Sequence, residues 1–230
     1  MSTESGQVPV KSDNSLDLIR VLGVIAVISG LLIVLAYQLT LPAVIKNRQI
    51  ATGEAILEVI RGTVSYKGFA LSEDGLTPLD AGSSDSPGMR KMYAGYDAAG
   101  NLLGVALEAA GQGYSDTIIV LYSYSPACEC INGIKVVQNR DTPGIGDKIQ
   151  KNLDFLKNFE QLDAKLNADK SGLANAIHTV KHGTKKNPWE VDAISGATIS
   201  SRAVGKMLNN STAASLPLLV KQFDKLKEQK

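Results

Sequence analysis

A β-hairpin is predicted in the middle of this 230-residue chain, at residues 89–109, which read MRKMYAGYDAAGNLLGVALEA. Two apolar runs, 89–96 and 102–109, flank the turn sequence DAAGN at 97–101. A short Asp-, Gly- and Asn-containing segment between apolar runs of strand length is typical of a tight antiparallel connection. The stretch therefore predicts the first strand pair of an antiparallel sheet.

The residues after this hairpin indicate how the rest of the domain is built. A further strand is expected at 117–123, and a second hairpin is expected with Asn132-Gly133 as its turn. Helices are then predicted from the apolar spacing at 148–166, 200–208 and about 216–229. Strands followed by helices predict an α+β domain with an antiparallel sheet and packed helices, not an alternating doubly wound fold.

The N-terminal part of the chain contains an apolar stretch without a charged residue at 21–45. As a helix, its 25 residues span about 37 Å at about 1.5 Å per residue, which exceeds the hydrocarbon thickness of a bilayer. The stretch is longer than the apolar region of a cleaved signal peptide, and no clean cleavage site follows it. We therefore expect an uncleaved transmembrane anchor at 18–45.

The flanks of this anchor complete the predicted organisation. Residues 1–17 form a polar, Ser-rich segment that predicts a disordered tail. Helical spacing at 43–62 predicts a helix that leads from the anchor into a globular domain at 46–230. Basic residues lie on both sides of the span, so the positive-inside rule does not set its orientation.

Composition excludes several classes of function. The chain has 24 Lys and Arg against 23 Asp and Glu, and no basic cluster, which argues against a nucleic-acid partner. Its two Cys cannot form a disulfide framework, a Cys-rich zinc module or a self-contained four-Cys iron–sulfur site. We therefore expect no metal site and no nucleic acid among its ligands.

Three segments rich in small residues are candidates for a binding site. Residues 192–201 read DAISGATISS and precede a predicted helix, where backbone N–H groups and the helix dipole favour an anion such as phosphate. The same pattern also fits a plain helix N-cap. Residues 141–148, DTPGIGDK, and 111–114, GQGY, are glycine loops that could line a flat cofactor or merely form turns.

Together these segments resemble the FMN-binding domain family. DAISGAT is similar to its flavin-attachment motif, TPGIG to its Thr-Pro-Gly-Leu-Gly segment, and GQGY to its Gly-x-Gly-aromatic loop, all in the family's order after a single span. Within this family the chain is most similar to G subunits of the Rnf ion-translocating electron-transport complex. C subunits of the sodium-pumping NADH:quinone oxidoreductase are close relatives. The resemblance covers about residues 18–208.

The resemblance implies FMN joined through its phosphate to the hydroxyl of Thr198 by a separate flavin transferase. Asp192 and Ser195 would belong to the recognition motif. The set of residues implied to bind the cofactor is Thr198, Asp192, Ser195, Gly196, Ala197, Ser201, Thr142, Gly144, Gly146, Gly111, Gly113 and Tyr114. The flavin would carry the redox chemistry, and the protein would hold and orient it.

Some residues lie outside the family pattern. Cys128 and Cys130 would point the same way on a strand and could share a metal, whereas a mutual disulfide at this spacing would be strained. His178 and His182 could face together on a helix, although a solvated face is the simpler interpretation. Trp189 could stack on the flavin or lie in the core.

The resemblance implies a membrane-anchored electron-transfer subunit with its domain on the outer, periplasmic face of the cytoplasmic membrane. Its partners would be the other membrane and redox subunits of the complex, the flavin transferase and the lipid bilayer. One span and one domain show no NADH fingerprint, quinone pocket or ion pathway, so the chain would not be a complete enzyme. The alternatives are the sodium-pumping C subunit and a flavin-binding regulatory module.

Overall fold

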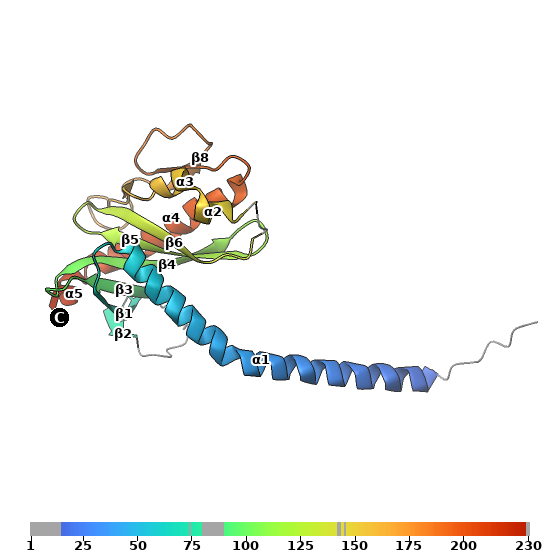
Figure 1. Cartoon of the computed structure of the whole chain (residues 1–230). Coiled ribbons are helices and arrows are strands. Elements are labelled where there is room, and N and C mark those ends of the chain that lie inside the picture. The colour runs from blue at the N-terminus through green and yellow to red at the C-terminus, as the bar shows by residue number, and fades with distance from the viewer. Residues whose placement is uncertain (1–14, 74, 80–89, 142–143, 145, 229–230) are drawn as a thin grey trace, which may run out of the picture. The chain divides into compact units, whose positions relative to one another are not determined.

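A computed structural model describes residues 15–73, 75–79, 90–141, 144 and 146–228. It divides the chain into two compact units, Met1–Ile50 and Ala51–Lys230. Helix α1, Ser15–Val59, belongs to both (Figure 1). The one helix α1 contains the segment expected at 18–45 and continues through the segment expected at 43–62 as far as Val59. The disordered tail expected at 1–17 is wrong for residues 15–17, which begin α1, and residues 1–14 lie outside the described residues.

In the part of α1 that belongs to the first unit, the apolar side chains are exposed, except for the half-buried Leu41. Leu22, Val27 and Ile33, for example, are each more than half exposed. By length and composition α1 can cross a membrane. Such exposure in a helix of this length is expected where lipid, and not protein, covers the side chains.

The second unit is built on a seven-stranded antiparallel sheet in the order β2-β1-β3-β4-β5-β6-β7 (Figure 1). The strands are β1 Ser65–Ser72, β2 Gly75–Pro78, β3 Arg90–Tyr96, β4 Leu102–Gln112, β5 Thr117–Ser125, β6 Cys130–Gln138 and β7 Leu162–Asp163. The hairpin β3–β4 is confirmed. Asp97 closes its turn because one side-chain oxygen accepts the N–H groups of Ala99 and Asn101, both at 2.8 Å.

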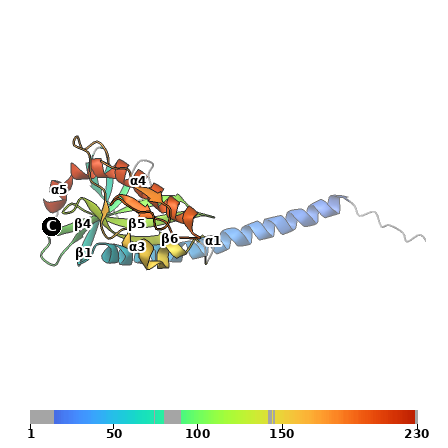
Figure 2. The same cartoon turned by 90° about the horizontal axis from the view of Figure 1, so that it is seen from above.

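Helices cover both faces of this sheet, so the predicted α+β class is confirmed. The long helix α4, Thr198–Val220, packs across one face (Figure 2). Leu107 and Tyr122 point to that face, whereas their neighbours Ala106 and Leu121 point to the other, against Ile56 of α1. This alternation follows from the two-residue period of a strand. The sheet is therefore buried on both sides at its centre.

The helix expected at 148–166 is wrong. Two short helices, α2 Lys148–Lys151 and α3 Leu153–Lys157, are followed by β7. Asn152 interrupts the helix because its backbone is extended and its side chain caps α3, accepting the N–H of Phe155 at 2.8 Å. The apolar spacing reflected burial of Ile149 and Phe159, not one continuous helix.

The turn expected at Asn132-Gly133 is also wrong, because both residues lie inside β6. The connection from β5 to β6 lies at residues 126–129. Gly133 is needed for close packing. A Cβ atom there would lie 2.8 Å from the backbone oxygen of Val59 and 3.2 Å from the Ser123 hydroxyl. Tertiary contact with the end of α1 therefore selects this glycine.

The C-terminal helices differ from those expected at 200–208 and about 216–229. Helix α4 continues through Pro217 to Val220, and α5 occupies Phe223–Glu228. The buried face of α4 runs on past residue 208 through Leu216 and Leu219, which keeps the helix on the sheet. His178 lies in the parallel pair formed by β8, His178–Val180, and β9, Glu190–Asp192. His182 follows that strand, so the two histidines do not share a helix.

Replacing Gly133 should destabilise the domain. We expect Gly133→Ala to cost about 1–3 kcal/mol, since the new methyl group meets a backbone atom that cannot move freely. For a domain of this size, that corresponds to a Tm lower by about 2–12 °C. Gly172→Ala is the matched control, because a Cβ there has nothing within 4 Å. Equal Tm values for the two variants would contradict this packing.

Candidate functional site

The three glycine- and serine-rich segments meet at the side chain of Asp141, which is only 6% exposed. One carboxylate oxygen accepts the N–H groups of Ser115 and Asp116, at 2.8 and 3.2 Å. The other accepts the N–H of Tyr114 at 3.1 Å and the hydroxyl of Ser200 at 2.8 Å. One carboxylate therefore joins the loop after β4, its own loop before α2, and the first turn of α4.

The glycines beside Asp141 are required by close approach. A Cβ at Gly113 would lie 2.7 Å from a carboxylate oxygen of Asp141, and one at Gly146 would overlap the Asp141 side chain. Gly111 instead lets β4 approach α4, because a Cβ there would lie 3.1 Å from Met207. Gly113 and Gly146 are buried, so they allow the loops to pack around Asp141 and do not face a ligand directly.

The turn before α4 is held from within and open on its outer side. The Ser201 hydroxyl donates to the backbone oxygen of Ala197 at 2.9 Å and accepts the N–H of Ile194 at 3.1 Å. Gly196 has a φ of +76°, in the left-handed region that favours glycine. Ala197 occupies the N-cap, and no side chain caps the first turn. Thr198 is the first residue of the helix and is half-buried.

This helix start has the physical properties of an anion site. An uncapped N-terminus leaves backbone donors for a ligand, and the dipole of the 23-residue helix favours negative charge there. Ser195 and Gly196 are exposed beside it. The Thr198 hydroxyl, at the first helical position, belongs to the same turn.

The exposed part of the site includes apolar and glycine positions suited to a flat ring. Tyr114 is 51% exposed and Ile199 is 56% exposed. Gly144 has a φ of +80° and open space where a Cβ would lie, and its N–H donates to Asp147. Thr142, which was expected to line the cofactor, lies outside the described residues.

Asp192 lies at the start of the motif and holds it to the neighbouring loop. One of its carboxylate oxygens accepts the N–H of Gly183 at 3.0 Å and lies 3.5 Å from the His182 ring. Its backbone N–H donates to the buried Asn158 at 3.0 Å. The other carboxylate oxygen is buried without a hydrogen-bond partner in the described part of the chain. Asp192 therefore orients the segment that leads to Thr198.

The same loop is fixed at its other end by Glu190. This carboxylate accepts the backbone N–H groups of Lys186 and Asn187 and a side-chain hydrogen bond from Asn187. These bonds lower the pKa of Glu190 to about 2. Trp189 is half-buried in the turn just before it. The loop between β8 and β9 is thus ordered by two acidic side chains.

Sequence reasoning missed Asp141 and Ser200 as organising residues. Burial raises the pKa of Asp141, but the hydrogen bonds from Ser115, Tyr114, Ser200 and Asp116 outweigh burial and lower it overall. The partners of Asp141 lie 25–27 and 59 positions away in the chain. No local pattern reports contacts at such separations, so only its place at the start of DTPGIGDK offered a signal.

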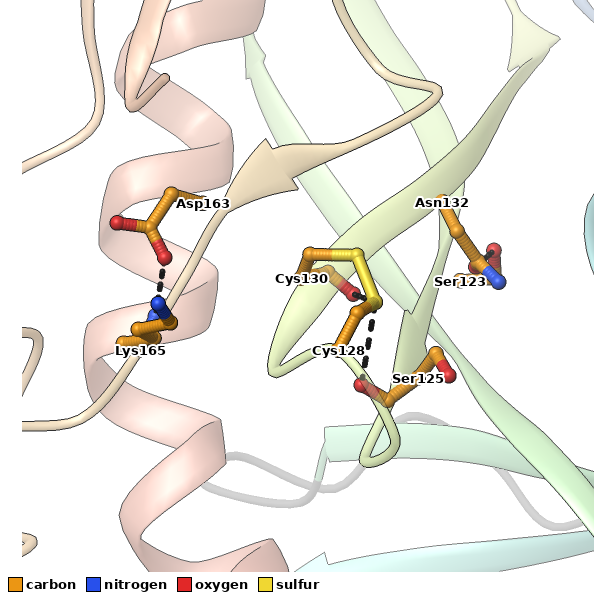
Figure 3. The surroundings of a disulfide bond; sticks show 7 residues. All are labelled: Ser123, Ser125, Cys128, Cys130, Asn132, Asp163 and Lys165. Atoms are coloured by element: carbon orange, nitrogen blue, oxygen red, sulfur yellow. Dashed lines mark hydrogen bonds between the residues drawn. A yellow bond between two sulfur atoms is a disulfide. The ribbon is translucent and has the colours of Figure 1, made fainter. Parts of the chain in front are cut away.

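The connection between β5 and β6 contains a disulfide between Cys128 and Cys130 (Figure 3). The expectation that a disulfide at this spacing would be too strained assumed strand geometry, which Glu129 does not have. Its φ of +51° turns the chain and brings the two Cα atoms to 5.1 Å. This separation is usual for a disulfide. The pair therefore forms a covalent turn, with Cys128 exposed and Cys130 buried.

Comparison with known proteins gives the class to which the fold and site belong. Residues 113–213 match the FMN-binding domain family. This range contains the segments 141–148 and 192–201 in full, and Gly113 and Tyr114 of the segment 111–114. The fold is similar to that of the C subunit of the Na⁺-translocating NADH-quinone reductase from Parabacteroides distasonis, at a TM-score of 0.59 and 23% identity. That alignment covers 80% of this chain and 96% of the other. Residues 113–213 thus match an FMN-binding domain, and the fold of the chain is similar to that of this subunit.

Sequence relatives narrow the class further. The G subunit of the ion-translocating oxidoreductase complex from Haemophilus influenzae is 30% identical over 206 residues, which cover 87% of this chain and 88% of the relative. The G subunit of the same kind of complex from Shewanella piezotolerans is 27% identical, with 79% and 80% covered. The chain belongs to the family of ion-translocating oxidoreductase complex G subunits.

Removing the charge of Asp141 should loosen the site in a pH-dependent way. We expect Asp141→Asn to cost about 2 kcal/mol at pH 7, because an amide cannot accept all four donors. The pKa of Asp141 is lower in the folded state than in the unfolded state. The stabilisation is therefore complete above the unfolded pKa, about 3.9, and is lost as the pH falls through the folded pKa.

Chemical denaturation of the wild type and Asp141→Asn between pH 7 and pH 2.5 measures this difference. The gap in unfolding free energy should narrow at the acid end. Asp169→Asn, at an exposed aspartate, serves as the control and should cost little at any pH. A gap that is constant or widens on acidification would show that the charge of Asp141 is not what holds the loops.

Proposed function

We propose that this protein is the electron-transfer subunit of a membrane-bound, Rnf-type ion-translocating oxidoreductase complex. It carries FMN joined by a phosphoester to the hydroxyl oxygen of Thr198. The observation that carries the proposal is the uncapped start of α4, where Thr198 lies at the first position beside exposed Ser195 and Gly196. Membership of the G subunit family supports the assignment to this class of complex.

The residues present fit the phosphate of FMN. The first turn of α4 offers backbone donors and a positive dipole end, which suit the anionic oxygens of a phosphodiester. The left-handed Gly196 lets the backbone turn close to the attachment point without a side chain in the way. Hydrogen bonds of Ser201 with Ala197 and Ile194 keep this turn in place before any ligand arrives.

The attachment step needs a hydroxyl that a transferase can reach and an activated flavin donor. In the proposed step the Thr198 oxygen bonds to the phosphorus of a flavin phosphoanhydride, and the bond from phosphorus to the bridging oxygen breaks. The displaced phosphate leaves, and the threonine proton passes to a base of the transferase. Asp141 positions the first turn of α4 through Ser200, so that Thr198 is presented at the surface.

Bound FMN would supply one- and two-electron redox chemistry. The chain's own part is to hold and orient the ring. The candidates for this are the exposed Tyr114 and Ile199 and the open loop at Gly144. Gly111, Gly113 and Gly146 support these loops from beneath. Stopped-flow reduction of the assembled complex would separate this electron-relay role from a regulatory flavin-binding role.

We further propose that the domain lies on the outer face of the cytoplasmic membrane, anchored by α1. The Cys128–Cys130 disulfide supports this side, because disulfides persist in oxidising compartments and are reduced in the cytosol. The partners would then be the membrane and redox subunits of the complex, the bilayer and a flavin transferase acting on that side. The alternative assignment, as the C subunit of a sodium-pumping quinone reductase, is supported only by similarity of fold.

Loss of the Thr198 hydroxyl should abolish flavin attachment. We expect Thr198→Ala, co-expressed with the transferase, to give a denaturing-gel band without ultraviolet fluorescence, since no oxygen remains to bond phosphorus. Thr198→Ser, which keeps a hydroxyl, should retain part of the signal. Thr184→Ala, at an exposed threonine outside the site, should fluoresce like the wild type. A fluorescent Thr198→Ala band would place the flavin elsewhere.

The proposed location can be tested through the chain's two cysteines. Cells are treated with a membrane-permeant alkylating reagent before lysis, and the mass of the intact protein is then measured by mass spectrometry. An oxidising compartment predicts no alkylation without reductant and two alkylated thiols after reduction. Cys130→Ser, which leaves Cys128 unpaired and exposed, should be alkylated without reductant and so controls for access. Alkylation of both cysteines in wild-type cells without reductant would contradict an outer location.

A further inference from the structure

Lys148 places a cation beside Gly196, just before α4, and has no acidic partner in the part of the chain that the structure describes. It is the first residue of α2, and its Nζ atom lies 3.6 Å from where a Cβ on Gly196 would be. Among the described residues, Lys148 has no ion pair or side-chain hydrogen bond. Its neighbour Lys151, in contrast, pairs with Asp147 at 2.9 Å.

The acidic groups nearby are already committed to other donors. Asp141 accepts four hydrogen bonds, and the carboxylate of Asp147 receives Lys151 and the N–H of Gly144. Asp192 accepts the N–H of Gly183. Each of these carboxylates is oriented by its own contacts within the loops. Among the described residues, none of these carboxylates forms an ion pair with Lys148.

Two positive ends therefore meet at one point. The start of α4 carries about half a positive charge from its dipole, and Lys148 adds a full one beside Gly196. Such an arrangement is unfavourable by itself, because like charges repel and neither is neutralised. An anion held between the ammonium group and the first turn of α4 would attract both positive groups and so offset their mutual repulsion. The geometry thus has the charge pattern of a two-sided phosphate clamp.

We propose that Lys148 is the counter-charge of the flavin phosphate and a specificity determinant for phosphorylated flavins. It would hold the phosphate against the first turn of α4 before and after attachment to Thr198. This inference rests on the proposed function and adds to it a residue outside the attachment motif. Lys148 acts on the phosphate and not on the ring, so its effect should appear with FMN and be absent with riboflavin.

Binding of free flavins to the full-length chain in detergent isolates this role. The Thr198→Ala background prevents attachment, and fluorescence quenching gives the affinity for FMN and for riboflavin. We expect Lys148→Ala to weaken FMN binding about tenfold and Lys148→Glu to weaken it further. Lys148→Arg should stay within about threefold of lysine, and the losses should shrink in high salt. Riboflavin binding should not change.

Lys206→Ala and Lys206→Glu are matched controls, since Lys206 is an exposed cation further along α4. They change net charge equally and should leave FMN affinity unaltered. The initial rate of flavin attachment to Thr198, followed by intact mass, should fall in the same order across the Lys148 variants. Tm values within about 2 °C of wild type would show that the fold is kept.

Any of three results would overturn the role of Lys148. One is FMN affinity in Lys148→Glu equal to that of the Lys206 variants. The second is an equal loss for FMN and riboflavin, and the third is a loss in Lys148→Arg as large as in Lys148→Glu. Either of these two would indicate a structural effect. If instead the wild type takes no flavin from its transferase, the proposed function fails. The binding measurements would then still report on Lys148 separately.

Discussion

The site depends on one buried carboxylate. From its own loop before α2, Asp141 accepts hydrogen bonds from the loop after β4 and from helix α4, both far away in sequence, and its side chain is only 6% exposed. A charged group in such a position is tolerated only because its oxygens are fully used by donors. The bonds fix where Tyr114 and the start of α4 lie. Without them the three segments would be separate surface loops.

The sheet sets the frame in which this carboxylate acts. Helix α4 covers one face and the end of α1 the other, so the strands at the centre are buried on both sides. Asp141 follows β6, and its carboxylate contacts the loop after β4 and the first turn of α4. The uncapped start of α4, the left-handed Gly196 and Lys148, which has no ion pair among the described residues, all occur at this one place. An uncapped helix start and neighbouring positive charges lower the local stability, and such features are common at functional sites.

Sequence patterns predicted the features that depend on local chemistry. The DAAGN hairpin, the exposed apolar span and a helix after DAISGAT all follow from propensity or periodicity. The errors arose where tertiary contacts decide. Asn152 ends a helix that periodicity would continue, and Gly133 serves packing against Val59 instead of a turn. Likewise, the motif glycines were identified, but their division into buried supports and exposed positions required the fold.

The central claim is that an FMN phosphate is bonded to Thr198, and peptide mass spectrometry of native material tests it most directly. The tryptic fragment 187–202 contains the whole DAISGATISSR segment. The account predicts that this fragment carries one FMN by mass and that fragmentation places it on Thr198. An unmodified fragment from a complex that turns over, or a flavin located on another residue, would contradict it.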